Sequence, residues 1–273
     1  MGDGYLAATP VLGTIAMAKL LRRPQQAIYR ALGYYPTSLG GLPFRCDPDH
    51  IEFWRKARTG RWEPHTLEII DRWLDAASVY LDIGAWIGPT VLYAARKCRS
   101  VLCLEPDPVA FEYLLRNLRL NQLENVTPFC LALGDRGGLR ALTGLGNGLG
   151  GSESTLLPSD HPAPRAWVPA IAWADWLRLA QPDSIELVKI DIEGGEFELL
   201  PVMREFLAHR LPPLLLSLHA PLLPPDQRRE ALGRLSQVMS IYPRCRDLEL
   251  RPVTAESVVE QSLHSLTSFL YSR

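Results

Sequence analysis

The chain has 273 residues, enough for one large α/β domain or for such a domain with an extension. Hydrophobic residues make up 47% and charged residues 22%, values typical of a soluble globular enzyme. The formal net charge of -1 gives no electrostatic reason to expect a nucleic acid or an anionic membrane as partner.

The first residues and the cysteines both indicate a cytoplasmic protein. Residues 1–10 include Asp3 and lack a basic region, so they do not resemble a secretory leader. The apolar stretch Val11–Leu21 is interrupted by Lys19 and is too short to span a bilayer. The five cysteines form no C-x-x-C pair and no zinc-ligand spacing, so we expect free thiols in a reducing compartment.

Residues 1–77 have the pattern of helices and turns without a strand, and we expect them to form an N-terminal helical extension. One helix begins near Asp49, and a second runs from Pro64 to Ala77. The second helix carries an apolar stripe, which predicts contact with the domain that follows. We place that second, catalytic domain at residues 78–273.

From residue 78 onward, short apolar strands alternate with amphipathic helices, the pattern of a doubly wound α/β fold with a mostly parallel, Rossmann-like sheet. The expected strands are Val79–Ile83, Val101–Leu104, Val126–Ala132, Ile185–Ile190 and Leu214–Leu218. The expected helices are Thr90–Lys97, Val109–Asn121 and Phe197–His209. Near the C-terminus, Arg246–Leu250 and Leu266–Tyr271 are expected to pair as an antiparallel hairpin at one sheet edge.

A glycine-containing turn, Asp82-Ile-Gly-Ala-Trp-Ile-Gly88, follows the first of these strands. Glycines at such a turn let the backbone approach a ligand at the N-terminus of the next helix. Glu105 ends the next strand about 20 residues further on, where an acid binds the ribose hydroxyls of an adenosine cofactor. Trp86 replaces the second glycine that a pyrophosphate needs, and Asp82 suits a cationic amino-acid group instead. The turn therefore favours S-adenosylmethionine over NAD.

Several segments together resemble the FkbM-type class I methyltransferases. They are Asp82–Gly88, Glu105–Pro108, Asn117, Asn121, Ala132–Asp135 and, most specific of all, the run Lys-Ile-Asp-Ile-Glu-Gly-Gly-Glu at Lys189–Glu196. The resemblance covers roughly residues 62–220. It implies a seven-stranded, mostly parallel sheet, S-adenosylmethionine as cofactor, and O-methylation of sugars, polyketide hydroxyls or related natural products. The family more often has asparagine where this chain has Trp86.

By position, the resemblance also assigns the cofactor contacts. Those around the methionine part would be Asp82, Gly84, Ala85, Trp86 and Gly88, with Glu105 on the ribose and Asp107 and Ala132 near the adenine. An indole in this place would contact the sulfonium by a cation–π interaction worth about 0.5–2 kcal/mol. The N-terminal extension would cover the cofactor or build the acceptor pocket.

Three polar side chains follow two neighbouring strands of the expected sheet. Asp191 and Glu193 come after the strand that ends at Ile190, and His219 follows the strand Leu214–Leu218. They are candidates for taking a hydroxyl proton, for orienting the acceptor or for holding a divalent metal such as Mg²⁺. As alternatives, the two acids would cap the next helix and the histidine would be a satisfied structural group.

Other glycine, aromatic and histidine residues have less context. The segment Gly144–Gly151 is either an active-site lid or a flexible surface loop. Three tryptophans are expected in the core, with sugar stacking by one of them as the alternative: Trp167, Trp173 and Trp176. Four histidines are expected to be surface or structural residues: His50, His65, His161 and His209.

The sequence thus predicts an S-adenosylmethionine-dependent O-methyltransferase that acts on a hydroxyl of a small glycosyl or natural-product acceptor. A second hypothesis is an N-methyltransferase. The near-neutral charge and the lack of an [Asp/Asn]-Pro-Pro-aromatic tetrad argue against it. A non-catalytic binding module with the same fold is a third, with Trp86 as its main support. We expect no nucleic-acid partner and no membrane span, and a homo-oligomer is left open.

Overall fold

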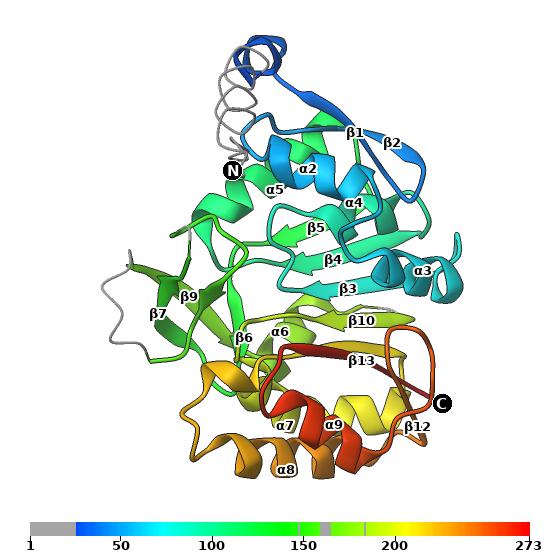
Figure 1. Ribbon diagram of the computed structural model, residues 1–273, viewed down its shortest axis with the longest axis vertical. Helices are drawn as coiled ribbons and strands as arrows, with labels where there is room; N and C mark the ends of the chain where they lie inside the picture. The colour runs from blue at the N-terminus through cyan, green and yellow to red at the C-terminus, as the bar shows by residue number, and fades with distance from the viewer. Residues whose placement is uncertain (1–25, 147, 159–164, 183) are drawn as a thin grey trace, which may run out of the picture.

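A computed structural model describes residues 26–146, 148–158, 165–182 and 184–273 (Figure 1). The apolar stretch Val11–Leu21 and His161, both named above, lie outside these described residues. Within them, helices are too short or too polar to cross a bilayer.

The main sheet has seven strands in the order β12-β13-β11-β10-β3-β4-β5, and all neighbours run parallel except where β13 is one of the pair. Its strands are β3 (Val79–Ile83), β4 (Ser100–Leu104), β5 (Val126–Phe129), β10 (Leu187–Ile190), β11 (Leu214–Leu218), β12 (Arg244–Arg246) and β13 (Thr267–Ser272). This confirms the predicted doubly wound α/β fold. The chain extends from β3 to β4 and β5 on one side and returns to β10 on the other, which places a topological switch point between β3 and β10.

Helices cover both faces of this sheet, because its central strands are apolar on both sides; every residue of β3 and of β10 is buried. One face packs with α3 (Pro64–Trp73), α4 (Pro89–Ala95) and α5 (Pro108–Leu120). The other face packs with α6 (Trp173–Ala180), α7 (Glu196–Arg210), α8 (Arg228–Met239) and α9 (Ala255–Ser262) (Figure 1). The buried apolar side chains accordingly form two hydrophobic clusters, one with the helices of each face.

The expected strand Val126–Ala132 is not one strand. β5 ends at Phe129, and Ala132 begins β6 (Ala132–Gly134), which belongs to a separate four-stranded sheet with the order β6-β9-β7-β8. The other strands of that sheet are β7 (Gly138–Gly144), β8 (Ser154–Thr155) and β9 (Arg165–Ala172). Both halves of the run are apolar, and apolar periodicity does not mark the place where a strand changes its partner.

The expectation that no strand precedes residue 78 is also wrong. The strands β1 (Tyr35–Leu39) and β2 (Leu42–Cys46) form an antiparallel hairpin. Gly40 and Gly41 form its two-residue turn with φ values of 51° and 81°, a conformation that favours glycine at both positions. Helical residues 26–32 precede the hairpin, and α2 (Ile51–Arg58) follows it. A short 3₁₀ helix after β11, η1 (Ala220–Leu222), completes the described elements.

The N-terminal segment is fixed to the sheet domain by a buried carboxylate. Asp47 accepts hydrogen bonds from the backbone amide and Nδ1 of His50, from Nε1 of Trp54 and from Nδ2 of Asn117 on α5. Asn117 Nδ2 also donates to the carbonyl of Ile87 in the glycine turn, at 2.9 Å. Burial alone would raise the pKa of Asp47, but the hydrogen bonds and the charge of His50 lower it below its usual value. One network therefore joins the N-terminal segment to the turn.

At the other edge of the sheet the antiparallel pairing of the C-terminal strands is confirmed, but not as a hairpin. β12 ends at Arg246, residues 247–250 form a turn around Asp247, and α9 lies between the two strands. Helix α3 likewise ends at Trp73 rather than at Ala77, since Leu74 is extended.

Two of the three tryptophans are placed as predicted. Trp173 and Trp176 are buried and stack at 5.3 Å between ring centroids. The prediction for Trp167 is wrong, because its side chain is 73% exposed. Alternation along β9 explains this: Val168 points into the protein, so its neighbour must point outward.

Candidate active site

A cavity of about 440 Å³ lies at the carboxyl ends of β3, β4, β10 and β11, beside the switch point of the sheet. Ligands bind at this place in open α/β sheets. The sequence-predicted residues that line it are Gly84, Ala85, Trp86, Glu105, Ala132, Asp191, Glu193 and His219. Three other predicted cofactor residues, Asp82, Gly88 and Asp107, are not part of its lining.

Close packing leaves no room for a side chain at two glycines of the turn after β3. Gly84 has a φ of 90°, and a Cβ added there would lie 1.9 Å from the carbonyl oxygen of Asp191. Gly88 has a φ of 92°, and a Cβ there would lie 2.5 Å from Leu114 of α5. The amides of Gly84 and Ala85 both donate to the carbonyl of Leu104, at 2.9 and 3.0 Å. The turn is therefore enclosed by the backbone of Asp191 and Leu104 and by the side chain of Leu114.

Trp86 adopts a left-handed backbone conformation with a φ of 49°, which is unfavourable for a bulky residue. Its indole Nε1 donates to the carbonyl of Gly150 at 3.0 Å, and its ring packs edge-to-face on Phe53 with centroids 4.6 Å apart. The strained residue thus links the turn to α2 and to the glycine-rich loop. The cation–π contact with a sulfonium stays a prediction.

Glu105 is 6% exposed and lies at the end of β4. Its Oε2 accepts a hydrogen bond from the amide of Trp86 at 2.7 Å, and its Oε1 accepts one from the amide of Asp107 at 2.8 Å. Burial raises the pKa of Glu105 to about 7. A carboxylate has about four lone-pair sites, so two remain for ribose hydroxyls.

Asp107 is fully buried and holds two elements together. Its Oδ1 accepts from the amides of Val109 and Ala110, which makes it the N-cap of α5. Its Oδ2 accepts from the amide of Gly150 at 2.7 Å and from the Ser154 hydroxyl at 2.8 Å. This side chain therefore shapes the cavity through the loop whose residues 151–154 line it.

Asp82 is buried beneath the turn rather than in the cavity wall. It accepts hydrogen bonds from the hydroxyls of Tyr80 and Thr90. The ammonium of Lys189, on the adjacent strand β10, lies 3.6 Å from Asp82 Oδ1 and 3.2 Å from Asp191 Oδ2. Burial alone would lower the pKa of Lys189, but the charges of Asp191, Asp82 and Glu63 raise it well above its usual value.

Sequence reasoning did not assign roles to Lys189 or Glu63, and both line the cavity. Lys189 lies in the family-like run and is the single charged residue of an otherwise apolar strand. A buried ammonium must be paired with an acid, so this pattern is the signal that marks Lys189. Glu63 precedes α3 and has no local feature that marks it.

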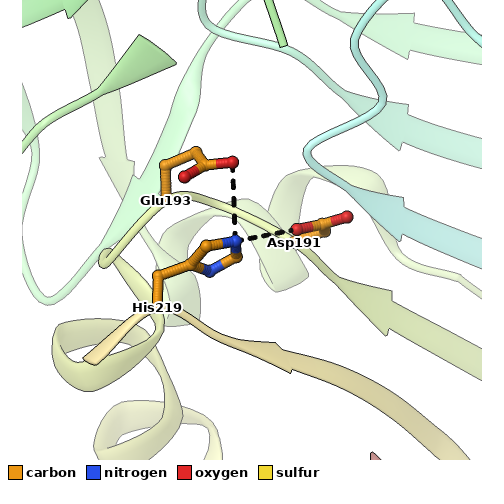
Figure 2. Close-up of side chains that lie close together, drawn as sticks. All are labelled: Asp191, Glu193 and His219. Carbon is orange, nitrogen blue, oxygen red and sulfur yellow. Dashed lines mark ion pairs between the residues drawn. The ribbon is translucent and has the colours of Figure 1, made fainter. Parts of the chain in front are cut away.

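The three candidate catalytic residues are brought together, as Figure 2 shows. Nε2 of His219 lies 3.3 Å from Asp191 Oδ1 and 3.4 Å from Glu193 Oε1. The acids follow β10, and the histidine follows the neighbouring strand β11. Neither acid caps α7, whose N-cap residue is Gly195 without a side-chain cap bond. The two carboxylates instead face one imidazole nitrogen.

A third carboxylate supports this cluster from the protein interior. Glu196 is fully buried; its Oε1 accepts from the amide of His219 at 2.6 Å and its Oε2 accepts from the amide of Gly194 at 2.9 Å. Its Oε1 also lies 3.4 Å from Nδ1 of His219. Glu196 belongs to the family-like run Lys189–Glu196, in which no role was predicted for it. Its contacts with the amide and Nδ1 of His219 hold the histidine in place.

The charges of the cluster determine its protonation. Burial alone would lower the pKa of His219, but Glu196, Asp191 and Glu193 together raise it to about 9, so the imidazole is protonated near neutral pH. Burial would raise the pKa of Asp191, but Lys189 and His219 lower it below its usual value. Burial raises the pKa of Glu193 to about 7 in spite of His219.

The cavity suits a cationic ligand such as S-adenosylmethionine. Five carboxyl groups line it at Glu63, Glu105, Glu153, Asp191 and Glu193, beside the cations Lys56, Lys189 and His219. The pKa of Glu105 and that of Glu193 are about 7, so these two groups are only partly ionised near neutral pH. A sulfonium or an ammonium would be stabilised by those carboxyl groups of the lining that are ionised. Trp86 lines the cavity at the sequence position where a pyrophosphate-binding turn has its second glycine, which disfavours NAD.

Asp191, Glu193 and His219 also meet the geometric requirement for a shared cation. Each offers one ligand atom, and these atoms all lie within 4.8 Å of one another. Two carboxylates and one imidazole are a donor set that divalent metals accept.

Comparison with known proteins gives a consistent assignment. The Methyltransferase FkbM domain matches residues 82–229, more than half of the chain. The methyltransferase sdnD of Sordaria araneosa is 32% identical over 152 residues, which are 44% of this chain and 58% of that protein.

Two solved structures are also among those similar to this chain. A methyltransferase FkbM from Methylobacillus flagellatus KT is 19% identical, covering 72% of this chain and 44% of that chain with a TM-score of 0.46. The Pyrococcus abyssi tRNA (uracil-54, C5)-methyltransferase, in complex with S-adenosyl-L-homocysteine, is 12% identical, covering 88% and 44% with a TM-score of 0.43.

The chain spans less than two thirds of the length of these three relatives. Its seven-stranded, mostly parallel sheet is typical of class I methyltransferases. With a family model matched over more than half of its residues, the chain belongs to the FkbM methyltransferase family.

Proposed function

We propose that the protein transfers a methyl group from S-adenosylmethionine to a hydroxyl of a small acceptor, such as a glycosyl or natural-product unit. One observation carries the O-acceptor part of this proposal: Asp191, Glu193 and His219 converge at the cavity wall, next to the glycine turn. An alcohol is a weak acid, so its methylation needs a positioned group to take the proton.

The cofactor would occupy the end of the cavity formed by β3 and β4. Gly84, Ala85 and Trp86 would surround its methionine part, Glu105 would accept the ribose hydroxyls, and Ala132 would lie beside the adenine. When bound there, S-adenosylmethionine supplies a methyl group activated by a positive sulfur. The protein's task is then to align the acceptor oxygen with that methyl group and to remove a proton.

In the transfer the sulfur–carbon bond breaks, an oxygen–carbon bond forms, and the hydroxyl proton passes to a carboxylate. His219 cannot accept that proton while it is itself protonated, so Asp191 or Glu193 takes it. Glu193 is the stronger base of the two near neutral pH, since its pKa is about 7. The imidazolium of His219 would keep both carboxylates aimed at the acceptor.

The same three side chains would hold a divalent cation such as Mg²⁺ if the reaction uses one. The cation would lower the pKa of a bound hydroxyl and orient it. This role and the role as proton acceptor differ in one measurable way, namely dependence of turnover on added metal.

The first test is calorimetric titration with S-adenosylmethionine and S-adenosylhomocysteine, with NAD as control. We expect saturable binding of the two sulfur ligands only, and its loss in Glu105→Ala. The second test follows labelled methyl transfer to matched alcohols and amines, with Mg²⁺ or with a chelator. Glu193→Gln, which removes the stronger base of the pair, should lower turnover on alcohols by about 10²–10⁴-fold. Transfer to amines only, or cofactor binding without turnover on any acceptor, would contradict the proposal.

A further inference from the structure

One wall of the cavity, beside Trp86 of the cofactor turn, is built by residues that the family model does not include. Phe53 and Lys56 come from α2, Trp62 and Glu63 from the segment before α3, and Leu266 from the residue before β13. All five lie outside the matched residues 82–229. This wall therefore lies outside the family match, and its chemistry bears on which acceptor the chain takes.

Much of the wall is a rigid apolar surface. The ring of Phe53 packs edge-to-face on Trp62, with centroids 5.2 Å apart, and on Trp86, with centroids 4.6 Å apart. These half-buried rings pack against the hydrophobic cluster that contains Trp54 and Ile70. Leu266 lines the same cavity and is 60% exposed, although leucine is more often buried. A ligand with an apolar body would cover it.

A single exposed cation stands beside this apolar surface. Lys56 lies three residues after Phe53 on α2, which places both on one face of the helix. Among the described residues, no carboxylate lies within ion-pair distance of its ammonium, although it lines the cavity. The nearby loop acid Glu153 is directed at its own loop, where its Oε2 lies 2.5 Å from the place of a Cβ on Gly146. Lys56 is thus free to bind an anion.

The polar end is the less exposed one: the side chains of Asp191, Glu193 and His219 are 26%, 16% and 5% exposed, whereas Lys56 is an exposed residue. From the interior to the rim, the cavity offers a hydroxyl site, an apolar wall and an ammonium group. A neutral sugar could stack its C–H face on the rings but would leave the cation without a partner. A long apolar molecule with a hydroxyl at one end and a carboxylate at the other would match all three regions.

Building on the proposed function, we propose that the acceptor is an amphipathic hydroxy acid whose apolar body lies on Phe53, Trp62 and Leu266 and whose carboxylate binds Lys56. Exposed ion pairs contribute little to affinity, and this cation therefore acts mainly on selection between charged and neutral acceptors. The apolar wall supplies the larger part of the binding.

The test uses the protein saturated with S-adenosylhomocysteine and a homologous series of ω-hydroxycarboxylic acids as probes. Each acid is compared by calorimetry with the α,ω-diol of the same length, and methyl glucoside serves as the polar probe. We expect the best acid to bind roughly fivefold more tightly than its diol. In Lys56→Gln this ratio should fall to about one, with binding of S-adenosylhomocysteine unchanged.

Two further variants make the result specific. Arg58→Gln removes a neighbouring exposed cation of α2 that is not part of the cavity lining, and it should leave the ratio as it is. Phe53→Leu should weaken acid and diol by the same factor, because it changes apolar contacts and leaves the charge of Lys56 in place. The inference is overturned if methyl glucoside binds more tightly than every acid, if no probe binds, or if Lys56→Gln leaves the ratio unchanged.

The inference and the proposed function fail in different ways. If the protein binds S-adenosylhomocysteine and the hydroxy acid but transfers no methyl group to it, the function is contradicted and the binding inference stands. If it methylates methyl glucoside and does not bind the acids, the function stands and the acceptor class is wrong.

Discussion

The two ends of the cavity are built by different means. At the cofactor end, the turn from Gly84 to Gly88 is fixed by backbone hydrogen bonds and by contacts that leave no room for a Cβ. At the acceptor end, the wall is formed by side chains from α2 and from the segment after it, and their positions depend on side-chain packing between distant parts of the chain. The turn lies within the family match, whereas the side chains of this wall lie outside it. The family assignment therefore bears on the cofactor end and not on this wall.

The largest effect is expected at the cofactor end, from Gly84→Ala. The added Cβ would meet the carbonyl oxygen of Asp191, and the φ of 90° would be strained for alanine. We expect a loss of about 4 kcal/mol in the free energy of unfolding, measured by urea denaturation.

The matched control is Gly233→Ala in α8, where an added Cβ meets no atom within 4 Å. Alanine favours a helix over glycine, so this variant should gain about 0.5–1 kcal/mol. Equal responses of the two variants would contradict the view that backbone packing fixes the cofactor end.

An effect of intermediate size is expected where the two ends are joined, at Asp47. In Asp47→Asn an amide group would face donors that now point at a carboxylate oxygen. We expect a loss of about 3 kcal/mol at pH 7. Because Asn117 also bonds to Ile87 in the turn, affinity for S-adenosylhomocysteine should fall as well. Loss of stability with unchanged affinity would show that the two ends are independent.

The pH dependence of that loss has a defined sign. The pKa of Asp47 is lower in the folded protein than in the unfolded chain, so its contribution is complete above about pH 4 and is lost as the pH falls further. Wild type and variant should therefore converge in stability in acid. Asp226→Asn, at an exposed position on the surface, is the control and should track the wild type at every pH.

The same division explains how much the sequence could predict. The turn, Glu105 and the acids after β10 follow strands in a fixed local pattern, and position in the chain was enough to place them in one cavity. The hairpin before α2, the second sheet and the exposed face of Trp167 depend on which strand pairs with which. Local periodicity does not contain that information. Glu63, Lys56 and Trp62 reach the cavity only through such long-range packing.

Trp86 is the residue where the two ends meet, and the smallest effect on overall stability is expected there. Asparagine, the residue that the family more often has, tolerates the left-handed conformation better than tryptophan. In Trp86→Asn, relief of backbone strain would offset the loss of the Phe53 contact and of the bond to Gly150, so global stability should change by less than about 1 kcal/mol.

The loop, however, would lose its attachment to the turn. Hydrogen exchange of the amides in residues 148–154 should become faster by about fivefold to tenfold, since one hydrogen bond of about 1 kcal/mol no longer opposes local opening. Exchange in β3 should not change, because its strand bonds do not involve the indole. If exchange in the loop stays slow, the bonds from Asp107 to Gly150 and Ser154 are enough to hold it. In that case the indole serves the acceptor wall alone, and the two ends of the cavity are more separate than the contacts of Trp86 indicate.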